Sequence, residues 1–225
     1  MANFITSKIP NTMTCGNLVS GCIATYFALC GEAKLALMWI VAGAVFDFFD
    51  GMSARLLGVS SPIGKELDSL SDAVSFGLAP GMVLYNMLVQ YEPESGVAYI
   101  AMLIPVFGAL RLAKFNVSTD QSTTFTGLPI PANAIFWIGF TNFYAEHHAD
   151  VPVLVVAVLV VALSLLMVCN LRMFSLKLHS LSVKENYKQY LLVLAFVICV
   201  GFCGVTGLAW AMLFYIVLSA VTKQD

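Results

Sequence analysis

Apolar runs of about twenty residues recur along the whole chain, and a helix needs a run of that length to cross the hydrocarbon core of a membrane. Of the 225 residues, 60% are hydrophobic and only 11% are charged. A soluble domain carries about a quarter charged residues. The sequence therefore predicts an all-α fold, a polytopic membrane helical bundle. The scarcity of lysine and arginine argues against nucleic acid as a partner, because binding to phosphate backbones needs clustered positive charge.

About eight transmembrane helices are predicted, separated by breaks rich in Gly, Pro and polar residues. The expected spans are 13–31, 35–57, 68–91, 96–116, 130–146, 151–170, 188–203 and 206–222. The last two are short and are joined by the tight turn sequence GVTG. A six-span core with one re-entrant hairpin is therefore the competing topology. Residues 1–12 are expected to form an amphipathic lead-in on the membrane surface.

The basic residues divide unevenly between the two sides of the predicted bundle. Ten of the 11 lysines and arginines fall on the side that holds both termini, and only Lys34 falls on the other. Cytoplasmic loops carry the excess of Lys and Arg in membrane proteins. Both termini are therefore expected in the cytoplasm, in a multi-pass protein of the cell membrane.

Residues 47–72, DFFDGMSARLLGVSSPIGKELDSLSD, hold four aspartates and interrupt the general avoidance of charge. At about 100° per residue, one helical face near the cytoplasmic end of the second span collects five residues. These are Asp47, Asp50, Gly51, Ala54 and Arg55. Two helices that each present a carboxylate pair would then face one another at the cytoplasmic boundary.

The second helix of this stretch is predicted from its start signal and its spacing. Ser61 and Pro62 have the pattern of an N-cap followed by a first-turn proline. Gly64, Asp68 and Asp72 then recur every four residues, which keeps them on one stripe of a helix.

Two interpretations of the aspartates compete. In the first, they are interfacial charges that reach toward water, with Asp50 and Arg55 loosely paired. An aspartate at mid-membrane costs about 2.5–3.5 kcal/mol on insertion scales, which argues against four chance placements. In the second, the carboxylates form a divalent-metal site for a phosphate-bearing ligand, since oxygen ligands suit Mg²⁺ or Mn²⁺ and two such ions can clamp a phosphoryl group. The small residues between them would let a nucleotide approach the backbone.

The complete pattern resembles the signature of the CDP-alcohol phosphatidyltransferases: Asp47-x-x-Asp50-Gly51-x-x-Ala54-Arg55, eight residues, then Gly64-x-x-x-Asp68-x-x-x-Asp72. The resemblance implies a helical membrane enzyme that displaces CMP from a CDP-linked lipid with an alcohol. It also implies that the four aspartates hold two divalent cations and that Asp72 is in addition the general base. The CDP-lipid site would be lined by Gly51, Ala54, Arg55, Gly64 and Thr14.

Thr14 belongs to the segment PNTMTCGN, in which Pro10, Asn11, Thr14 and Asn17 resemble the family's start of the first helix. The resemblance implies one integral membrane domain over residues 1–225. Residues 13–146 would form the catalytic core spans and residues 147–225 additional packing spans. A homodimer is a further expectation from the family.

The acceptor alcohol is predicted from the segments FGALRLAKFNVS and FTGLPIPAN, which resemble the phosphatidylserine synthase branch of the family. The branch implies transfer of a phosphatidyl group from CDP-diacylglycerol to L-serine. Arg111 and Lys114 share a helical face, and both are candidates to bind the serine, Arg111 through a bidentate contact with its carboxylate. Anchoring at the cytoplasmic surface is the alternative role for Lys114.

Two other functions remain open at this point. The first is the same chemistry with glycerol 3-phosphate, inositol or inositol phosphate as the acceptor, although a phosphorylated acceptor should need more inward-facing basic residues. The second is a divalent-cation transporter lined by the aspartates. A transporter predicts acidic residues spread along a path through the membrane, whereas these crowd at one boundary.

Overall fold

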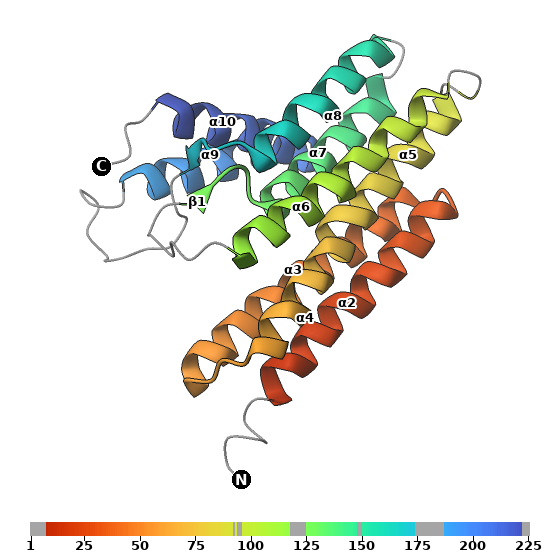
Figure 1. Ribbon diagram of the computed structural model, residues 1–225. Coiled ribbons are helices and arrows are strands. Elements are labelled where there is room, and N and C mark those ends of the chain that lie inside the picture. Colours follow the sequence, from red (N-terminus) through yellow and green to blue (C-terminus); the bar gives the residue numbers. More distant parts are fainter. Residues whose placement is uncertain are drawn as a thin grey trace. The chain divides into compact units, whose positions relative to one another are not determined.

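The computed structural model describes residues 8–91, 93, 96–117, 125–147, 150–173 and 187–221, and these are nearly all helical (Figure 1). The chain divides into two compact units, Met1–Ala113 and Lys114–Asp225. The predicted helical fold is thus confirmed for the described residues.

The first unit is built around α2. Its elements are α2 (Lys8–Leu29), α3 (Ala33–Leu57), α4 (Pro62–Asp72), the π-helix η1 (Ala73–Leu78), α5 (Ala79–Tyr91), the 3₁₀ helix η2 (Val97–Met102) and α6 (Leu103–Val117). α2 packs along α3 and also contacts α4, η1 and α5, an arrangement that Figure 1 shows in red, orange and yellow. α2 therefore bridges the two helices on which the aspartates were predicted.

The turn between α3 and α4 follows from local chemistry. Gly58 caps α3 in the left-handed conformation, with φ 61°, which glycine adopts without steric cost. Ser61 is extended, and its Oγ accepts a hydrogen bond from the backbone N of Gly64 at 3.0 Å. Pro62 occupies the first turn of α4. The predicted N-cap and first-turn proline are therefore confirmed.

The π-helix η1 begins directly after Asp72 and brings its backbone close to α2. A Cβ on Gly21 of α2 would lie 2.8 Å from the Cα of Ser75, so only glycine permits this approach. π-helical segments are rare and occur frequently at functional sites. Neither the π-helix nor the close contact was predicted from the sequence.

The described residues of the second unit form four apolar helices, a short 3₁₀ helix and one pair of very short strands. Its elements are β1 (Phe125–Thr126), α7 (Ile130–His147), α8 (Val153–Val168), β2 (Arg172–Met173), α9 (Tyr187–Cys203), the 3₁₀ helix η3 (Gly204–Thr206) and α10 (Gly207–Val221). Its core contains Trp137, Tyr144 and Tyr215, none more than 2% exposed. β1 and β2 pair antiparallel, with Phe125 opposite Met173. This pair of two-residue strands departs from the all-α prediction.

Four helical stretches of the described chain are long and apolar enough to span a membrane: Ala33–Leu57, Pro62–Tyr91, Val97–Val117 and Gln189–Val221. Val153–Val168 is a shorter apolar helix. The third span was predicted to start at residue 68, but the helix starts at Pro62, directly after its N-cap Ser61. The count of eight spans and the cytoplasmic termini stay predictions.

One predicted feature, the amphipathic lead-in, lies partly outside the described residues, whereas the GVTG turn lies within them. Residues 1–7 of the amphipathic lead-in are not described, and from Lys8 onward the lead-in is already part of α2. The predicted GVTG turn coincides with a helical interruption, where Gly204 has φ 57°. The backbones of α9 and α10 approach closely there: a Cβ on Gly207 would collide with the carbonyl of Cys199, so glycine is needed at this position.

Candidate active site

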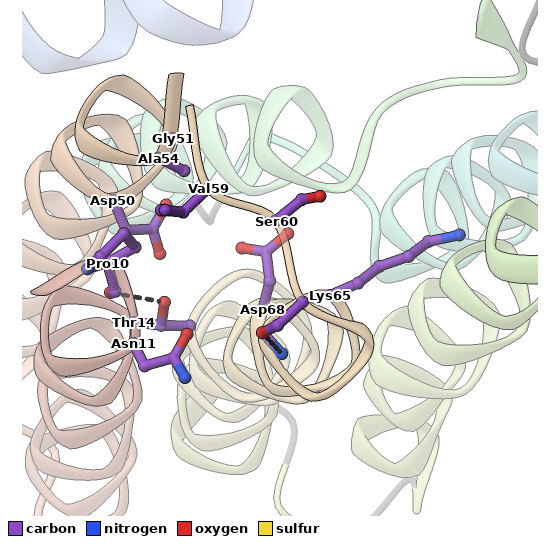
Figure 2. Close-up of a pocket in the computed structure, with 12 residues that line it drawn as sticks. Pro10, Asn11, Thr14, Asp50, Gly51, Ala54, Val59, Ser60, Lys65 and Asp68 are labelled. Atoms are coloured by element: carbon purple, nitrogen blue, oxygen red, sulfur yellow. Dashed lines mark hydrogen bonds between the residues drawn. The ribbon is translucent and has the colours of Figure 1, made fainter. Parts of the chain in front are cut away.

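Three of the four predicted aspartates converge. Asp47 and Asp50 come from α3 and Asp68 comes from α4, and their ligand oxygens all lie within 4.8 Å of one another. Figure 2 shows the carboxylates of Asp50 and Asp68 pointing toward each other across the pocket. The helical spacing explains the arrangement, since residues three apart on α3 share a face and the Gly58–Ser61 turn returns the chain toward them. Three of the four carboxylates of the predicted cluster therefore lie close together in the structure.

The surroundings of Asp50 fit a bound cation. Asp50 is only 6% exposed, and its Oδ2 is buried with no hydrogen-bond partner among the described residues. The hydroxyl of Thr14 lies beside this carboxyl group. A buried anionic oxygen without a partner is unfavourable, and a coordinated metal ion is one of the few groups that satisfies it. Oxygen donors in this number suit Mg²⁺ or Mn²⁺.

Asp72 lies at the end of α4 in different surroundings. It is 9% exposed, and its Oδ1 accepts a hydrogen bond from Nδ2 of Asn17 at 3.2 Å. Its carboxyl group also interacts with that of Asp47. Among the described residues, Asp72 is not one of the three whose ligand oxygens all lie within 4.8 Å of one another. The structure thus distinguishes Asp72 from the other three aspartates.

A pocket of about 270 Å³ opens beside the carboxylates. Four residues that the resemblance assigned to the CDP-lipid site line it: Thr14, Gly51, Ala54 and Gly64. A Cβ on Gly51 would meet nothing nearer than Nη2 of Arg55, at 3.9 Å, so the glycine leaves the backbone of α3 open to a ligand. Arg55 itself is not among the lining residues. It is exposed, and its Nε donates to the carbonyl of Gly51 at 2.8 Å.

Six lining residues were not predicted as site residues: Pro10, Asn11, Val59, Ser60, Ser61 and Lys65. They come from the start of α2, the turn and the first turn of α4, and all but Ser61 are labelled in Figure 2. Asn17, Ser71 and Ser75 were also not assigned roles, although all three are buried beside Asp72. A signal for α2 was present in the sequence, because Pro10, Thr14, Asn17 and Gly21 recur at helical spacing on one face of an apolar helix.

The two residues predicted to bind serine do not line this pocket. Arg111 is half-buried on α6. Lys114 is exposed, and its Nζ donates to the carbonyl of Val168 at 3.1 Å and to Oδ1 of Asn170 at 2.8 Å. These contacts with the C-terminal end of α8 give the ammonium group of Lys114 two hydrogen-bond acceptors, so its position is explained without a bound ligand. Binding of the acceptor by either residue stays a prediction.

Comparison with known proteins gives consistent matches. Residues 7–168 match the model of the CDP-alcohol phosphatidyltransferase family. A CDP-diacylglycerol–serine O-phosphatidyltransferase of Mycobacterium leprae is 41% identical over 138 residues, which are 58% of this chain and 45% of that protein. The enzyme of the same name from Bacillus subtilis is 41% identical over 123 residues, 55% of this chain and 69% of that protein.

An archaetidylserine synthase of Methanothermobacter thermautotrophicus is 34% identical over 154 residues, 67% of this chain and 65% of that protein. The chain spans about half the length of the M. leprae relative and about two thirds of the other two. The family model covers all four aspartates and every residue that lines the pocket. On this match and on the convergence of its carboxylates, the chain belongs to the CDP-alcohol phosphatidyltransferase family.

Proposed function

We propose that this protein transfers the phosphatidyl group of CDP-diacylglycerol to the hydroxyl of L-serine, giving phosphatidylserine and CMP. The observation that carries the proposal is the cluster of Asp47, Asp50 and Asp68 beside a pocket whose wall includes open helix backbone at Gly51. The names of the M. leprae and B. subtilis relatives support serine as the acceptor. The membrane-length helices fit a lipid substrate.

The four aspartates would hold two divalent cations, Mg²⁺ or Mn²⁺, with Asp47, Asp50 and Asp68 as the principal ligands. When bound, these ions neutralise the pyrophosphate of the CDP-lipid and withdraw electrons from its phosphorus. The pocket residues have a different role, because they place the nucleotide. Thr14, Gly51, Ala54 and Gly64 would contact the CDP group, and Arg55 at its edge adds a positive charge for a phosphate oxygen.

Asp72 is proposed to act on the acceptor as the general base. The serine hydroxyl oxygen forms a bond to the phosphorus of the phosphatidyl group, and the bond from that phosphorus to the bridging oxygen of CMP breaks. Asp72 takes the hydroxyl proton, and CMP leaves with the electrons of the broken bond. A serine hydroxyl is a weak nucleophile until a positioned base accepts its proton. Of the four aspartates, the one set apart from the tight cluster suits this role.

The acceptor site and the membrane placement complete the proposal. Arg111 would hold the serine carboxylate, and Lys114 would assist or anchor the cytoplasmic surface. The excess of basic residues on one side of the predicted spans supports an active site at the cytoplasmic face of the cell membrane. A homodimer in the membrane stays an expectation from the family.

The test is CMP release by the purified protein with CDP-diacylglycerol and a panel of alcohols. Serine should give CMP and phosphatidylserine, whereas glycerol 3-phosphate, inositol and inositol phosphate should give neither. Excess chelator should abolish release, and added Mg²⁺ or Mn²⁺ should restore it. Transfer to one of the other alcohols would identify a sister enzyme. Transport of divalent cations without CMP release would overturn the enzymatic proposal.

A further inference from the structure

Asn17 is a buried polar residue that the proposed reaction does not yet use. It lies in the middle of α2, is 0% exposed, and donates a hydrogen bond from Nδ2 to Oδ1 of Asp72 at 3.2 Å. An asparagine inside an apolar helix is costly unless its amide finds partners. Here the partner of the amide nitrogen is the aspartate proposed as the base.

The orientation of the Asn17 amide is determined by Asp72. As the proposed base, Asp72 must be ionised, and an ionised carboxylate only accepts hydrogen bonds, so the amide presents its NH₂ group to it. Oδ1 of Asn17 then has no hydrogen-bond partner among the described residues. It faces α3, where a Cβ on Gly43 would lie 2.9 Å away. A buried carbonyl without a partner is unfavourable, so the contact with Asp72 is what keeps the amide in this orientation.

Two further hydrogen bonds fix the backbone on either side of Asp72. Oγ of Ser71 donates to the carbonyl of Thr14 at 3.0 Å, and Oγ of Ser75 donates to the carbonyl of Asn17 at 2.9 Å. Both serines are 0% exposed. The end of α4 and the start of η1 are therefore joined to α2 at three successive points, and Asn17 takes part in two of them. α2 cannot slide past Asp72 without breaking all three.

We propose that Asn17 is a positioning residue for Asp72: it holds one carboxylate oxygen, so that the other oxygen is presented to the acceptor hydroxyl and to the neighbouring aspartates. The interaction of Asp72 with Asp47 supports this assignment, because the carboxyl group contacts the cluster while Asn17 occupies Oδ1. The inference rests on the proposed function, in which Asp72 takes the serine proton.

The first experiment separates positioning from helix packing. Asn17→Leu keeps the branching of the side chain and removes the donor. We expect kcat to fall by about 10- to 100-fold, as for other residues that orient a reacting group. The affinity for CDP-diacylglycerol, measured by calorimetry, should change less than about twofold. Ser20→Ala is the matched control, because Ser20 is 1% exposed on the same helix and its Oγ bonds to Gly16 within α2.

The outcomes of this comparison distinguish positioning of Asp72 from packing of α2. An unchanged kcat in Asn17→Leu overturns the inference. Equal losses in Asn17→Leu and Ser20→Ala would mean that α2 packing is responsible, which also overturns it. So would parallel losses of kcat and substrate affinity. A selective loss of kcat in Asn17→Leu supports it.

A second experiment tests the contact without any activity. Asn17→Asp places two carboxylates together, and adding Asp72→Asn restores an amide–carboxylate pair with the roles exchanged. In excess chelator, the thermal unfolding midpoint should fall in Asn17→Asp. Adding Asp72→Asn should raise the midpoint more in Asn17→Asp than in the wild type, where it only removes repulsion within the carboxylate cluster. The double variant should still lack turnover. An equal rise in the two backgrounds overturns the contact with Asp72. If the wild type releases no CMP with serine, the proposed function fails, and this unfolding comparison still reports on the contact.

Discussion

Asp50→Asn is expected to change stability in opposite directions with and without divalent cations. Without cations, the ligand oxygens of Asp47, Asp50 and Asp68 lie within 4.8 Å of one another, and three negative charges at this distance repel. Asparagine has the same shape and no charge, so the substitution removes the repulsion of Asp50 with both neighbours. The metal-free variant should therefore be more stable than the metal-free wild type.

The size of the effect follows from Coulomb's law. Two unit charges 4.8 Å apart repel by about 1 kcal/mol at the dielectric constant of water and by about 3.5 kcal/mol at an effective value of about 20. Because Asp50 is only 6% exposed, the larger value is the upper limit for each pair in which both carboxylates are ionised. With a cation at about 100 times its dissociation constant, the wild type should gain about 2.7 kcal/mol. Asp50→Asn lacks one anionic ligand and should gain much less.

The assay is thermal unfolding of purified protein in chelator and in Mn²⁺, without substrate. Asp150→Asn is the matched control, since Asp150 is exposed and outside the cluster. It should leave both unfolding midpoints unchanged. The reasoning is refuted if Asp50→Asn destabilises the metal-free protein, or if it responds to Mn²⁺ as strongly as the wild type.

Three further predictions concern the pocket, the turn and the acceptor. Gly51→Leu should raise KM for CDP-diacylglycerol in the CMP-release assay, because the side chain would enter the pocket, with little loss of stability, because nothing lies nearer to its Cβ than Nη2 of Arg55 at 3.9 Å. Gly201→Leu, whose Cβ would have nothing within 4 Å, should leave KM unchanged. Ser61→Ala removes the side-chain cap of α4 and should lower the free energy of unfolding by about 1 kcal/mol, and Ser61→Asp, which keeps a cap acceptor, should not. Arg111→Ala should raise KM for serine, because it removes a charge-assisted contact worth about 1.5–3 kcal/mol, and it should leave KM for CDP-diacylglycerol nearly unchanged. Equal effects on both KM values would assign Arg111 to the nucleotide site or to a structural role.

Local chemistry explains which parts of the site could be predicted. The face shared by Asp47 and Asp50 follows from the helical period, and the start of α4 follows from the capping chemistry of Ser61 and Pro62. Both depend on residues within one or two turns of each other. For the same reason the apolar runs located α3, α5 and α6 without any knowledge of their packing.

The remainder depends on contacts between helices that the local sequence does not contain. The contact of Asn17 with Asp72 joins α2 to α4, and the approach of Gly21 to Ser75 requires the π-helix η1. The pairing of Phe125 with Met173 likewise joins residues far apart in the chain. The helical spacing of Thr14 and Asn17 is a signal of a polar face on α2 that the sequence prediction did not use, and the partner of that face is set by tertiary packing.

The region around Asp72 takes part in two sets of interactions with opposite effects on stability. The repulsion among the carboxylates destabilises the metal-free site, whereas the hydrogen bonds from Asn17, Ser71 and Ser75 join the same region to α2. These hydrogen bonds involve no cation, so they hold the end of α4 in place before metal or substrate arrives. A base that is already positioned requires no reorganisation at the moment of proton transfer. The polar face of α2 therefore supplies to Asp72 the fixed geometry that the cluster of like charges cannot supply by itself.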